Sequence, residues 1–406
     1  MRVLEINSCV NGSTGSIIKA IKNYLEKMHD ECITSSRKDF SKRKLAPNNH
    51  IFIGNILSKH FDNKLAYFTG KEGHFTRLST FFFLRKIDKF NPDIIHLHNL
   101  HANYINLEML FRYIKKNRIK VVWTLHDCWS FTGHCPHFEM QKCYLWRHEC
   151  RNCTLFKDYP ASRIDNSTYM YNEKKKIFRG VEGLTIVTPS DWLEKLVKES
   201  FLSVYNTKVI NNGIRIDSFC QKGTSILHKK YGISNDKIII LGVASGWEER
   251  KGLNVFDSLS KDLPDKYIII LVGINENVKT RISSRIIAIE RTENQDELAS
   301  IYSEADIFLN PTLEDTYPTV NIEAICCGTP VFTYNTGGSG EIIKKGCGKV
   351  IERGNYKQLK QEIINYNREE WDRDLIASNR KYFSEKRMAE EYYNLYKKML
   401  NSENEM

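Results

Sequence analysis

The segment LNPTLEDTYPTVNIEAICCGTP, residues 309–330, combines residue types that can bind a charged ligand. It predicts a buried strand from Ile307 to Asn310, an acidic loop that holds Glu314 and Asp315, and then a helix opened by Pro318. A proline at the first helical position wastes no donor. The N–H groups of the first turn and the helix dipole then favour an anion.

A second carboxylate follows inside the same predicted helix. Glu323 lies more than one turn from the helix start, so it can reach a neutral group beside the anion, such as a ribose diol. Thr319 and Val320 stand at the helix start and are the donor-binding positions predicted there. An acidic loop, an anion-binding helix start and a carboxylate one turn later together suit a nucleotide-diphosphate sugar.

Two cations follow another predicted strand, Ile238 to Ala244. Arg250 and Lys251 precede Gly252, and a helix begins at Leu253. Cations at this place can neutralise the charge that grows on a leaving diphosphate. The alternative is a surface pair at a helix start, where the helix dipole would oppose it. This conflict favours the functional interpretation.

The segment from Asn11 to Ser16 contains Gly12 and Gly15 before a predicted helix. Such a loop lets backbone amides approach a phosphate, and we predict that both glycines contact the donor. A tight turn without a ligand explains the two glycines equally well. The loop does not spell the dinucleotide fingerprint, because its third glycine is missing.

Histidines follow two more strands. His126 comes after the apolar run Val121 to Leu125 and could hydrogen-bond a sugar hydroxyl, although a structural role is the alternative. His96 and His98 alternate, so they face one side of a strand, and His101 follows three residues later. We expect a hydrogen-bonded cluster at the strand end rather than a metal site.

Four cysteines lie close together in a polar segment: Cys135, Cys143, Cys150 and Cys153. Only the last two have C-x-x-C spacing. Four thiolates in a short insertion suit a tetrahedral structural zinc, and unligated thiols or disulfides are the alternatives. A closed four-cysteine site leaves no open coordination position, so the metal would not be catalytic.

Strand and helix patterns alternate along the chain, which predicts an α/β protein with parallel sheets covered by helices. At 406 residues the chain exceeds one core. We predict an N-terminal domain, 1–212, with a cysteine-rich insertion at about 128–160, and a second domain, 213–379. We expect the C-terminal helix, 380–406, to pack back on the first domain. Strands are predicted at Val3–Asn7, Ile94–His98, Val121–Leu125, Leu184–Thr188, Val209–Asn211, Ile238–Ala244, Tyr267–Val272, Ile307–Asn310 and Val331–Tyr334.

The net charge of +11 fits a nucleic acid, an anionic membrane face or phosphate-bearing substrates. Basic clusters occur at Ser41–Lys44, Lys115–Arg118 and Lys174–Lys176, and each is most simply a solvated surface. None is interleaved with aromatic residues as in a nucleic-acid module, so we expect no nucleic-acid partner. Together they allow peripheral contact with anionic lipid. No apolar run is long enough to span a bilayer, and the N-terminus lacks a signal-peptide core, so we expect a cytoplasmic protein.

These motifs resemble the family-4 retaining glycosyltransferases of the GT-B fold. The resemblance extends over nearly the whole chain and includes His126-Asp127, Pro189 to Leu193, Val209 to Phe219, Lys251-Gly252, the 315–323 block with Cys327 to Pro330, and Gly337 to Glu341. It implies two Rossmann-like domains that face each other across a cleft, the first for the acceptor and the second for the donor. The closest likeness is to bacterial enzymes that build surface polysaccharides.

The family's hallmark is two glutamates separated by seven residues. Registered by Glu323, the first position falls on Asp315, with Glu314 one residue earlier. The resemblance implies that the first acid holds the donor sugar and that Glu323 holds the ribose; whether Asp315 or Glu314 takes the first role stays open. The arginine usual five residues before the lysine is Gly246 here, so Arg250 takes its place in this interpretation.

The resemblance also implies the reaction. The acceptor hydroxyl attacks from the face on which the diphosphate leaves, so neither an enzymic nucleophile nor a divalent metal is needed. We therefore expect a retaining transfer of a hexose, from a UDP-sugar in the simplest case, to a lipid-linked or polysaccharide acceptor. The alternatives are a nucleotide-sugar epimerase on the same fold and a nucleic-acid binder that uses the cysteines as a zinc knuckle.

Overall fold

The computed structural model describes residues 1–37, 48–54, 56–223 and 225–401. The chain forms two compact units. Unit 1 comprises Met1–Asn211 and Lys386–Met406, and unit 2 comprises Asn212–Glu385. The predicted basic cluster at 41–44 lies outside the described residues.

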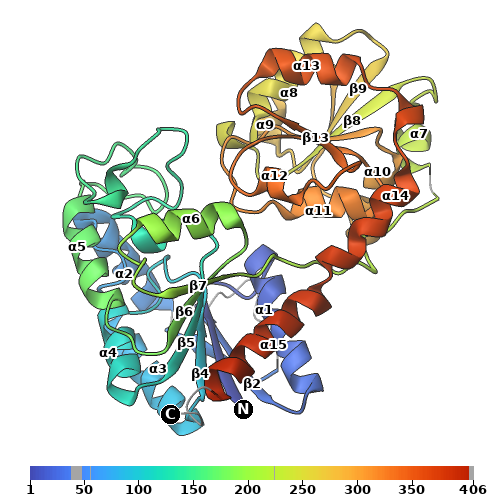
Figure 1. Ribbon diagram of the computed structural model, residues 1–406. Coiled ribbons are helices and arrows are strands. Elements are labelled where there is room, and N and C mark those ends of the chain that lie inside the picture. Colours follow the sequence, from blue (N-terminus) through green and yellow to red (C-terminus); the bar gives the residue numbers. More distant parts are fainter. Residues whose placement is uncertain (38–47, 55, 224, 402–406) are drawn as a thin grey trace. The chain divides into compact units, whose positions relative to one another are not determined.

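Unit 1 contains a seven-stranded parallel sheet with the order β3-β2-β1-β4-β5-β6-β7. Helices cover both faces of this sheet (Figure 1). The strands are β1 (Arg2–Asn7), β2 (Glu31–Arg37), β3 (His50–Ile53), β4 (Ile94–Leu97), β5 (Lys120–Thr124), β6 (Leu184–Thr188) and β7 (Asn206–Val209). The helices are α1 (Gly12–Lys27), α2 (Ile56–Thr69), α3 (Arg77–Phe90), α4 (Leu107–Asn117), α5 (Ser167–Phe178), α6 (Asp191–Glu199) and α15 (Glu385–Asn401).

Unit 2 contains a six-stranded parallel sheet with the order β10-β9-β8-β11-β12-β13. The strands are β8 (Ile238–Val243), β9 (Tyr267–Val272), β10 (Ile286–Ile289), β11 (Ile307–Asn310), β12 (Val331–Tyr334) and β13 (Gly348–Ile351). The helices are α7 (Ile226–Tyr231), α8 (Leu253–Asp262), α9 (Glu276–Lys279), α10 (Gln295–Glu304), α11 (Thr319–Cys326), α12 (Ser339–Ile342), α13 (Tyr356–Ile364) and α14 (Arg373–Ser378).

Both faces of each sheet are buried, because successive strand residues enter different hydrophobic clusters. In β8, Ile239 and Leu241 pack in the cluster that includes α10 and α11, while Ile240 packs in the cluster that includes α8 and α13. Parallel strands with two buried faces read as continuous apolar runs, which explains why the sequence signals them strongly. The predicted α/β class with two parallel sheets is confirmed.

In each sheet, the direction in which successive strands are added reverses once. The strand order reverses between β1 and β4 in unit 1 and between β8 and β11 in unit 2. In open parallel sheets, ligands collect beyond the carboxyl ends of the strands at this switch point. The residues that follow β1 and β4 in unit 1, and those that follow β8 and β11 in unit 2, therefore stand where a ligand is expected.

The C-terminal helix α15 packs on unit 1. Met388, Tyr392, Leu395 and Tyr396 are buried in one cluster with residues of β1, β4 and α1. This helix covers the face of the sheet that α1 also covers, and Figure 1 shows the two helices beside the strands. The amphipathic pattern of the sequence thus corresponds to a helix with one buried face.

The structure differs from the sequence analysis in two places, one strand that was not predicted and one lysine whose environment was predicted wrongly. The strand β2 was not predicted, because its sequence ECITSSR has no apolar run; nevertheless Thr34, Ser35 and Ser36 are all buried. The second concerns Lys174, which the sequence groups with solvated cations. It is buried, and its Nζ donates to the Trp129 carbonyl (2.8 Å) and the Thr132 carbonyl (3.2 Å). Burial lowers the pKa of Lys174 to about 7.

Candidate active site

At the switch point of unit 2, the loops after β8 and β11 are joined by hydrogen bonds. The Leu313 amide donates to the Arg250 carbonyl (2.7 Å), and the Thr312 hydroxyl lies 3.1 Å from the same carbonyl. The first of these contacts is a backbone bond between the two loops. Lys251, on the first loop, forms a short ion pair with Asp315 on the second. The structure therefore brings these two predicted residues together.

Gly252 allows the two loops to approach so closely. Its φ is +77°, and a Cβ atom at this position would lie 2.4 Å from the Pro311 carbonyl oxygen. Any larger residue would push the β11 loop away from the Arg250–Lys251 turn. The glycine thus sets the distance between Lys251 and the acidic loop.

Arg250 and Glu314 directly precede Lys251 and Asp315 in the sequence, and their side chains have different surroundings from those of that ion pair. Arg250 pairs through Nε with Glu248 (3.0 Å), and its side chain is about 29% exposed. Glu314 is buried, and its backbone carbonyl accepts a hydrogen bond from the Thr312 hydroxyl (3.1 Å). Asp315 is only half-buried and lies beside the cation, so it is the acid that a ligand reaches more directly.

The helix α11 begins at Thr319, with Pro318 in the N-cap position. The proline stands one residue before the predicted place, because its extended ψ of 111° keeps it outside the helix. Thr319 and Val320 occupy the first turn and are half-buried. Their amides have no residue four positions earlier in the helix to bond, which is the property that makes a helix start attract anions.

Glu323 lies one turn further along α11. Its Oε2 accepts a hydrogen bond from the buried Tyr302 hydroxyl (3.0 Å). Burial raises the pKa of Glu323 to about 7, although the Tyr302 hydrogen bond acts in the opposite direction. The carboxyl group is thus poised between its two protonation states near neutral pH.

Next to the switch point of unit 1, His126 follows β5 and its ring lies nearly parallel to that of His98. The centroids are 5.3 Å apart with an interplanar angle of 9°, and His126 Nε2 lies 2.9 Å from His98 Nδ1. Burial holds the pKa of His126 well below its usual value, with a contribution from His98. His126 is therefore a neutral base at neutral pH.

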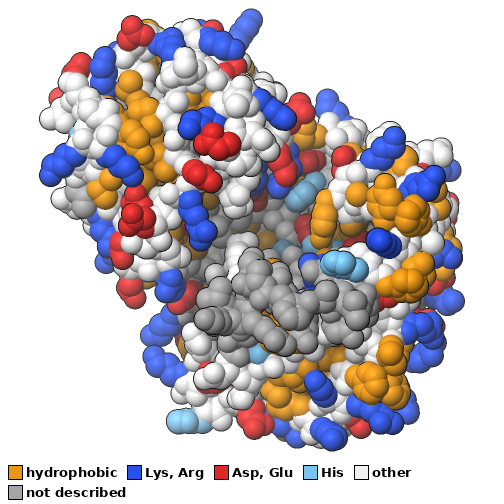
Figure 2. Space-filling model, turned by 180° about the vertical axis from the view of Figure 1, so that it is seen from behind, with side chains coloured by type: hydrophobic (Ala, Val, Ile, Leu, Met, Phe, Trp, Pro, Cys, Tyr) orange, Lys and Arg blue, Asp and Glu red, His pale blue; other side chains and the backbone are white. Residues whose placement is uncertain are grey.

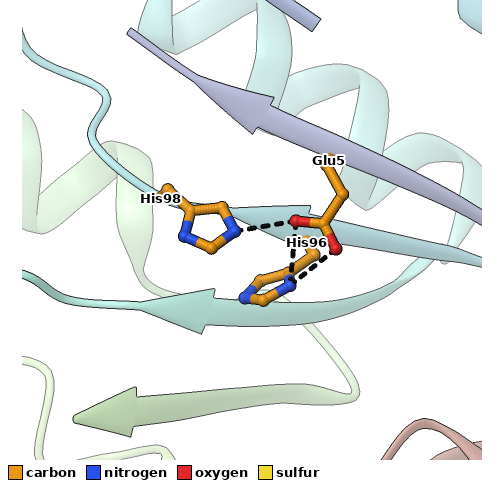
Figure 3. A group of neighbouring side chains, drawn as sticks. All are labelled: Glu5, His96 and His98. Carbon is orange, nitrogen blue, oxygen red and sulfur yellow. Dashed lines mark hydrogen bonds and ion pairs between the residues drawn. The ribbon is translucent and has the colours of Figure 1, made fainter. Parts of the chain in front are cut away.

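The predicted histidine cluster exists, with Glu5 as a member that the sequence did not reveal. Figure 3 shows His96 and His98 on β4 and its carboxyl end, both directed at the Glu5 carboxylate on β1. His98 Nε2 lies 2.7 Å from Glu5 Oε2, and His96 Nδ1 lies 3.1 Å from the carboxylate. An acid between Leu4 and Ile6 in an apolar strand was the available signal.

His101 does not join this group. Its Nε2 lies 3.1 Å from Asp127 Oδ2, and its Nδ1 lies 2.7 Å from the Tyr159 hydroxyl. Asp127 also accepts a hydrogen bond from the Trp129 amide (2.9 Å). The neighbours His126 and Asp127 therefore contact different histidines: His126 contacts His98, and Asp127 contacts His101.

The two predicted donor glycines start helix α1. Gly12 has a φ of +81° and open space around it. A Cβ at Gly15 would lie 2.5 Å from the Val10 carbonyl, so Gly15 lets the helix fold against the loop that precedes it. The amide nitrogen of the Asn11 side chain is buried without a hydrogen-bond partner. A structural reason therefore accounts for Gly15, and a positive φ accounts for Gly12.

All eleven cysteines lie in the described part of the chain, and none forms a disulfide. The Cys135 and Cys153 thiols share a hydrogen bond, which raises the pKa of Cys135 and lowers that of Cys153. Cys150 accepts from the Gly133 amide (3.1 Å). Among the described residues, the one set of three or more potential ligands whose atoms all lie within 4.8 Å is Glu5, His96 and His98. The four predicted cysteines do not form such a set.

The sequence patterns of two known families match this chain. The pattern described as "Glycosyltransferase Family 4" matches residues 59–218, and that described as "Glycosyl transferases group 1" matches residues 224–385. The chain is a family-4-type glycosyltransferase. The resemblance deduced from its motifs is confirmed.

This glycosyltransferase is similar to proteins from several bacteria. It is 25% identical over 331 residues to an Escherichia coli K12 protein named as a colanic acid biosynthesis glycosyl transferase, WcaC, with 76% of this chain and 77% of WcaC covered.

Solved structures share its architecture. Sucrose-phosphate synthase from Thermosynechococcus elongatus matches 99% of each chain with a TM-score of 0.72 and 15% identity. Anabaena HepE, solved in complex with UDP-glucose, matches 99% of this chain and 100% of its own with a TM-score of 0.65 and 15% identity. These likenesses confirm the GT-B fold.

Proposed function

We propose that this glycosyltransferase transfers a hexose, with retention of configuration, from a UDP-sugar to a glycan or lipid-linked acceptor during surface-polysaccharide synthesis. The observation that supports it best is the joined loops of unit 2, which bring Lys251 and Asp315 together beside the start of α11. The name of WcaC and the UDP-glucose complex of HepE support the polysaccharide and the nucleotide, respectively.

In unit 2, each part of the donor has a residue of suitable chemistry. The amides of Thr319 and Val320 and the Lys251 ammonium suit the diphosphate. Glu323 suits the ribose diol, since an ionised carboxylate accepts two hydroxyl hydrogen bonds and its pKa of about 7 lets it ionise when a ligand arrives. Asp315 is then the acid for the donor sugar, and Arg250 is a second cation.

In unit 1, His126 is the residue proposed to contact the reacting sugar. It stands at the carboxyl end of β5 and is neutral, so it can form a hydrogen bond with a hydroxyl without adding charge. We propose that unit 1 binds the acceptor and that Gly12 and Gly15 admit the donor phosphates near α1.

The proposed chemistry uses the donor's own phosphate as base. The bond from the anomeric carbon to the diphosphate oxygen breaks, the acceptor oxygen bonds to the anomeric carbon on the same face, and the acceptor proton passes to the departing phosphate. Lys251, Arg250 and the α11 amides stabilise the negative charge that develops on the leaving diphosphate. We propose that no divalent metal is required for this step.

A panel of UDP- and GDP-sugars, assayed by nucleotide release with purified full-length protein, tests the donor. We expect release with a UDP-hexose and an unchanged rate in the presence of EDTA. Proton NMR of the product reports the anomeric configuration. An inverted product would overturn retention, and transfer that depends on added metal would overturn metal independence.

A surface on α2 and α3 supports peripheral membrane contact. Six large apolar side chains that are at least 43% exposed lie there: Phe61, Tyr67, Phe68, Leu78, Phe81 and Phe82. Exposed cations lie among them, and Arg85 stacks over the Phe81 ring at 4.8 Å. Figure 2 shows orange side chains interspersed with blue ones on the unit that contains these helices. Aromatic rings among cations suit the interface of an anionic bilayer.

No helix in the described residues has the length and hydropathy to span a bilayer. From the exposed aromatic side chains and cations of α2 and α3, we propose adsorption through this surface. Co-sedimentation with phosphatidylglycerol vesicles should retain the protein, and Phe81→Ser with Phe82→Ser should release most of it. Leu375→Ser with Tyr382→Ser, at similarly exposed sites of unit 2, is the matched control. Equal loss in the control pair would remove the surface from this role.

We further propose a structural zinc at Cys135, Cys143, Cys150 and Cys153. Tetrahedral Zn–S bonds of about 2.3 Å would require the sulfur atoms to lie roughly 3.8 Å apart, closer than the structure places them as a set. Binding would therefore draw the segment together. Elemental analysis of the wild-type protein and of Cys150→Ser should show one zinc that the variant loses together with thermal stability; protein without zinc would contradict this proposal.

A further inference from the structure

A chain of buried hydrogen bonds connects Glu5 to His126. Glu5 and His98 are at most 1% exposed, and their atoms Oε2 and Nε2 are 2.7 Å apart. On the other side of the same imidazole ring, His98 Nδ1 lies 2.9 Å from His126 Nε2. The ring of His98 thus bridges the carboxylate of β1 and the histidine that follows β5.

The direction of each bond in this chain follows from Glu5. Burial alone would raise the pKa of Glu5, but the charge and hydrogen bonds of His96 and His98 lower it to about 2, so the carboxylate is ionised and only accepts. His98 Nε2 must therefore carry a proton. Burial and His96 lower the pKa of His98 to about 4, so its Nδ1 holds a lone pair.

The same reasoning extends to the next ring. Because His98 Nδ1 accepts, His126 Nε2 must donate the 2.9 Å hydrogen bond. His126 is neutral, so its second nitrogen, Nδ1, has a lone pair. Asp127, His96 and His101 also act electrostatically on His126.

We propose that Glu5 and His98 are positioning residues that hold His126 in the neutral Nε2–H tautomer, so that His126 accepts a hydrogen bond from a hydroxyl of the bound sugar through Nδ1. The identity of that ligand rests on the proposed function, while the tautomer does not. Where a histidine transfers a proton, an acid that fixes its tautomer raises the reaction rate by several orders of magnitude. For a positioning role without proton transfer, loss of the acid should lower kcat about 10- to 100-fold.

A second arm of the network leads away from His126. His96 Nε2 lies 2.8 Å from the Thr124 hydroxyl, which lies 2.9 Å from the Tyr392 hydroxyl of α15. The Tyr396 hydroxyl lies 2.7 Å from His96 Nδ1. This arm is equally buried and ends on the same carboxylate, but it does not touch His98 Nδ1 or His126.

The same side chains, Glu5, His96 and His98, could also be ligands of a metal ion. In the directed network, His96 Nδ1 and His98 Nε2 both carry protons that point at Glu5, so neither offers the lone pair that a metal needs. The hydrogen-bond interpretation therefore accounts for every polar atom of the trio that the structure pairs.

Nitrogen-15 NMR of histidine-labelled full-length protein tests the tautomer without substrate. At pH 7, we expect the His126 signals, identified by their loss in His126→Gln, to show a protonated Nε2 and an unprotonated Nδ1. A protonated Nδ1, or a charged ring, would overturn the proposal. Elemental analysis of the same sample that finds a metal lost in Glu5→Gln would overturn it as well.

Activity then tests the role of the tautomer. In Glu5→Gln the amide can both donate and accept, so we expect a mixed His126 tautomer, a kcat about 10- to 100-fold lower and a shifted pH profile, with the affinity for UDP unchanged. The control Tyr392→Phe breaks the other arm and should leave kcat, the profile and the tautomer as in the wild type. If Glu5→Gln does not fold, the wild-type NMR still decides.

The two hypotheses fail differently. Wild-type protein that transfers no sugar contradicts the proposed function and leaves the tautomer measurable. Wild-type protein that transfers sugar while Glu5→Gln folds, keeps the wild-type tautomer and keeps its kcat contradicts the positioning role alone.

Discussion

The two units reverse their strand order in the same way, yet they fill that place with opposite chemistry. In unit 1, the edge between β1 and β4 is occupied by Glu5, His96 and His98, all fully buried and bonded to one another. In unit 2, the edge between β8 and β11 holds the Lys251–Asp315 pair, whose side chains are 23% and 16% exposed. A single topology thus positions a base in one unit and offers charge to a ligand in the other.

Replacing Lys251 should have the largest effect on this comparison. We expect Lys251→Ala to lower kcat/KM about 10²- to 10³-fold, because a cation that stabilises a developing anion is lost. Lys261→Ala is the matched control, since Lys261 forms an exposed i,i+4 pair with Asp257. Similar rates for both variants would show that Lys251, on the loop after β8, does not stabilise the leaving diphosphate.

The pH dependence of stability should separate the two units. His98 has a pKa of about 4 in the folded state and 6.5 when unfolded, so unit 1 loses stability as the pH falls from 6.5 to 4, by about 3 kcal/mol for this group. Glu323 has a raised pKa of about 7 in the folded state. The stability that its carboxyl group contributes to unit 2 is therefore fully present below pH 4.5 and is lost as the pH rises through 7.

Hydrogen exchange followed by mass spectrometry at pH 4.5 and 6.5 measures both units in one sample, after correction for the intrinsic pH dependence of exchange. Protection of β4 should increase with pH, while protection of α11 should decrease. Parallel changes in both segments would contradict the opposite electrostatics of the two edges.

A smaller effect is expected from Glu323→Gln. The loss of one charge-assisted hydrogen bond should weaken UDP binding about 10- to 100-fold by isothermal titration. The melting temperature should stay close to that of the wild type at pH 6 and not fall at pH 8, because the amide cannot ionise. A large loss of stability at both values would assign Glu323 to the fold and leave unit 2 without its ribose contact.

Much of the fold could be predicted because the central strands are apolar on both faces. The limits of β6, β9, β11 and β12 coincide with the predicted ones. The strands β3, β10 and β13 were not predicted: each lies at an edge of its sheet and is only partly buried, so it lacks the two buried faces of the central strands. The strand β2 was missed for another reason: its buried side chains Thr34, Ser35 and Ser36 carry hydroxyl groups, so its sequence does not look apolar.

The candidate site divides in the same manner. Lys251 and Asp315 were singled out because each follows a strongly predicted strand, and adjacent strands bring them together. Glu5 was not singled out from the sequence. Its partner His96 lies on β4, and nothing local in either strand specifies that β1 and β4 pair. The contacts of Tyr392 and Tyr396 with this group join residues about 270 to 390 positions apart, a separation that no motif encodes.

The position of α15 in the sequence has a consequence for biosynthesis. A ribosome completes all seven strands of unit 1 and then the whole of unit 2 before it releases the helix that covers Glu5 and His96. Throughout that interval the nascent chain exposes an ionised carboxylate and an apolar sheet face. Chaperone occupancy should therefore persist until α15 has emerged from the ribosome, and a premature stop codon before Tyr392 should yield a product that is degraded.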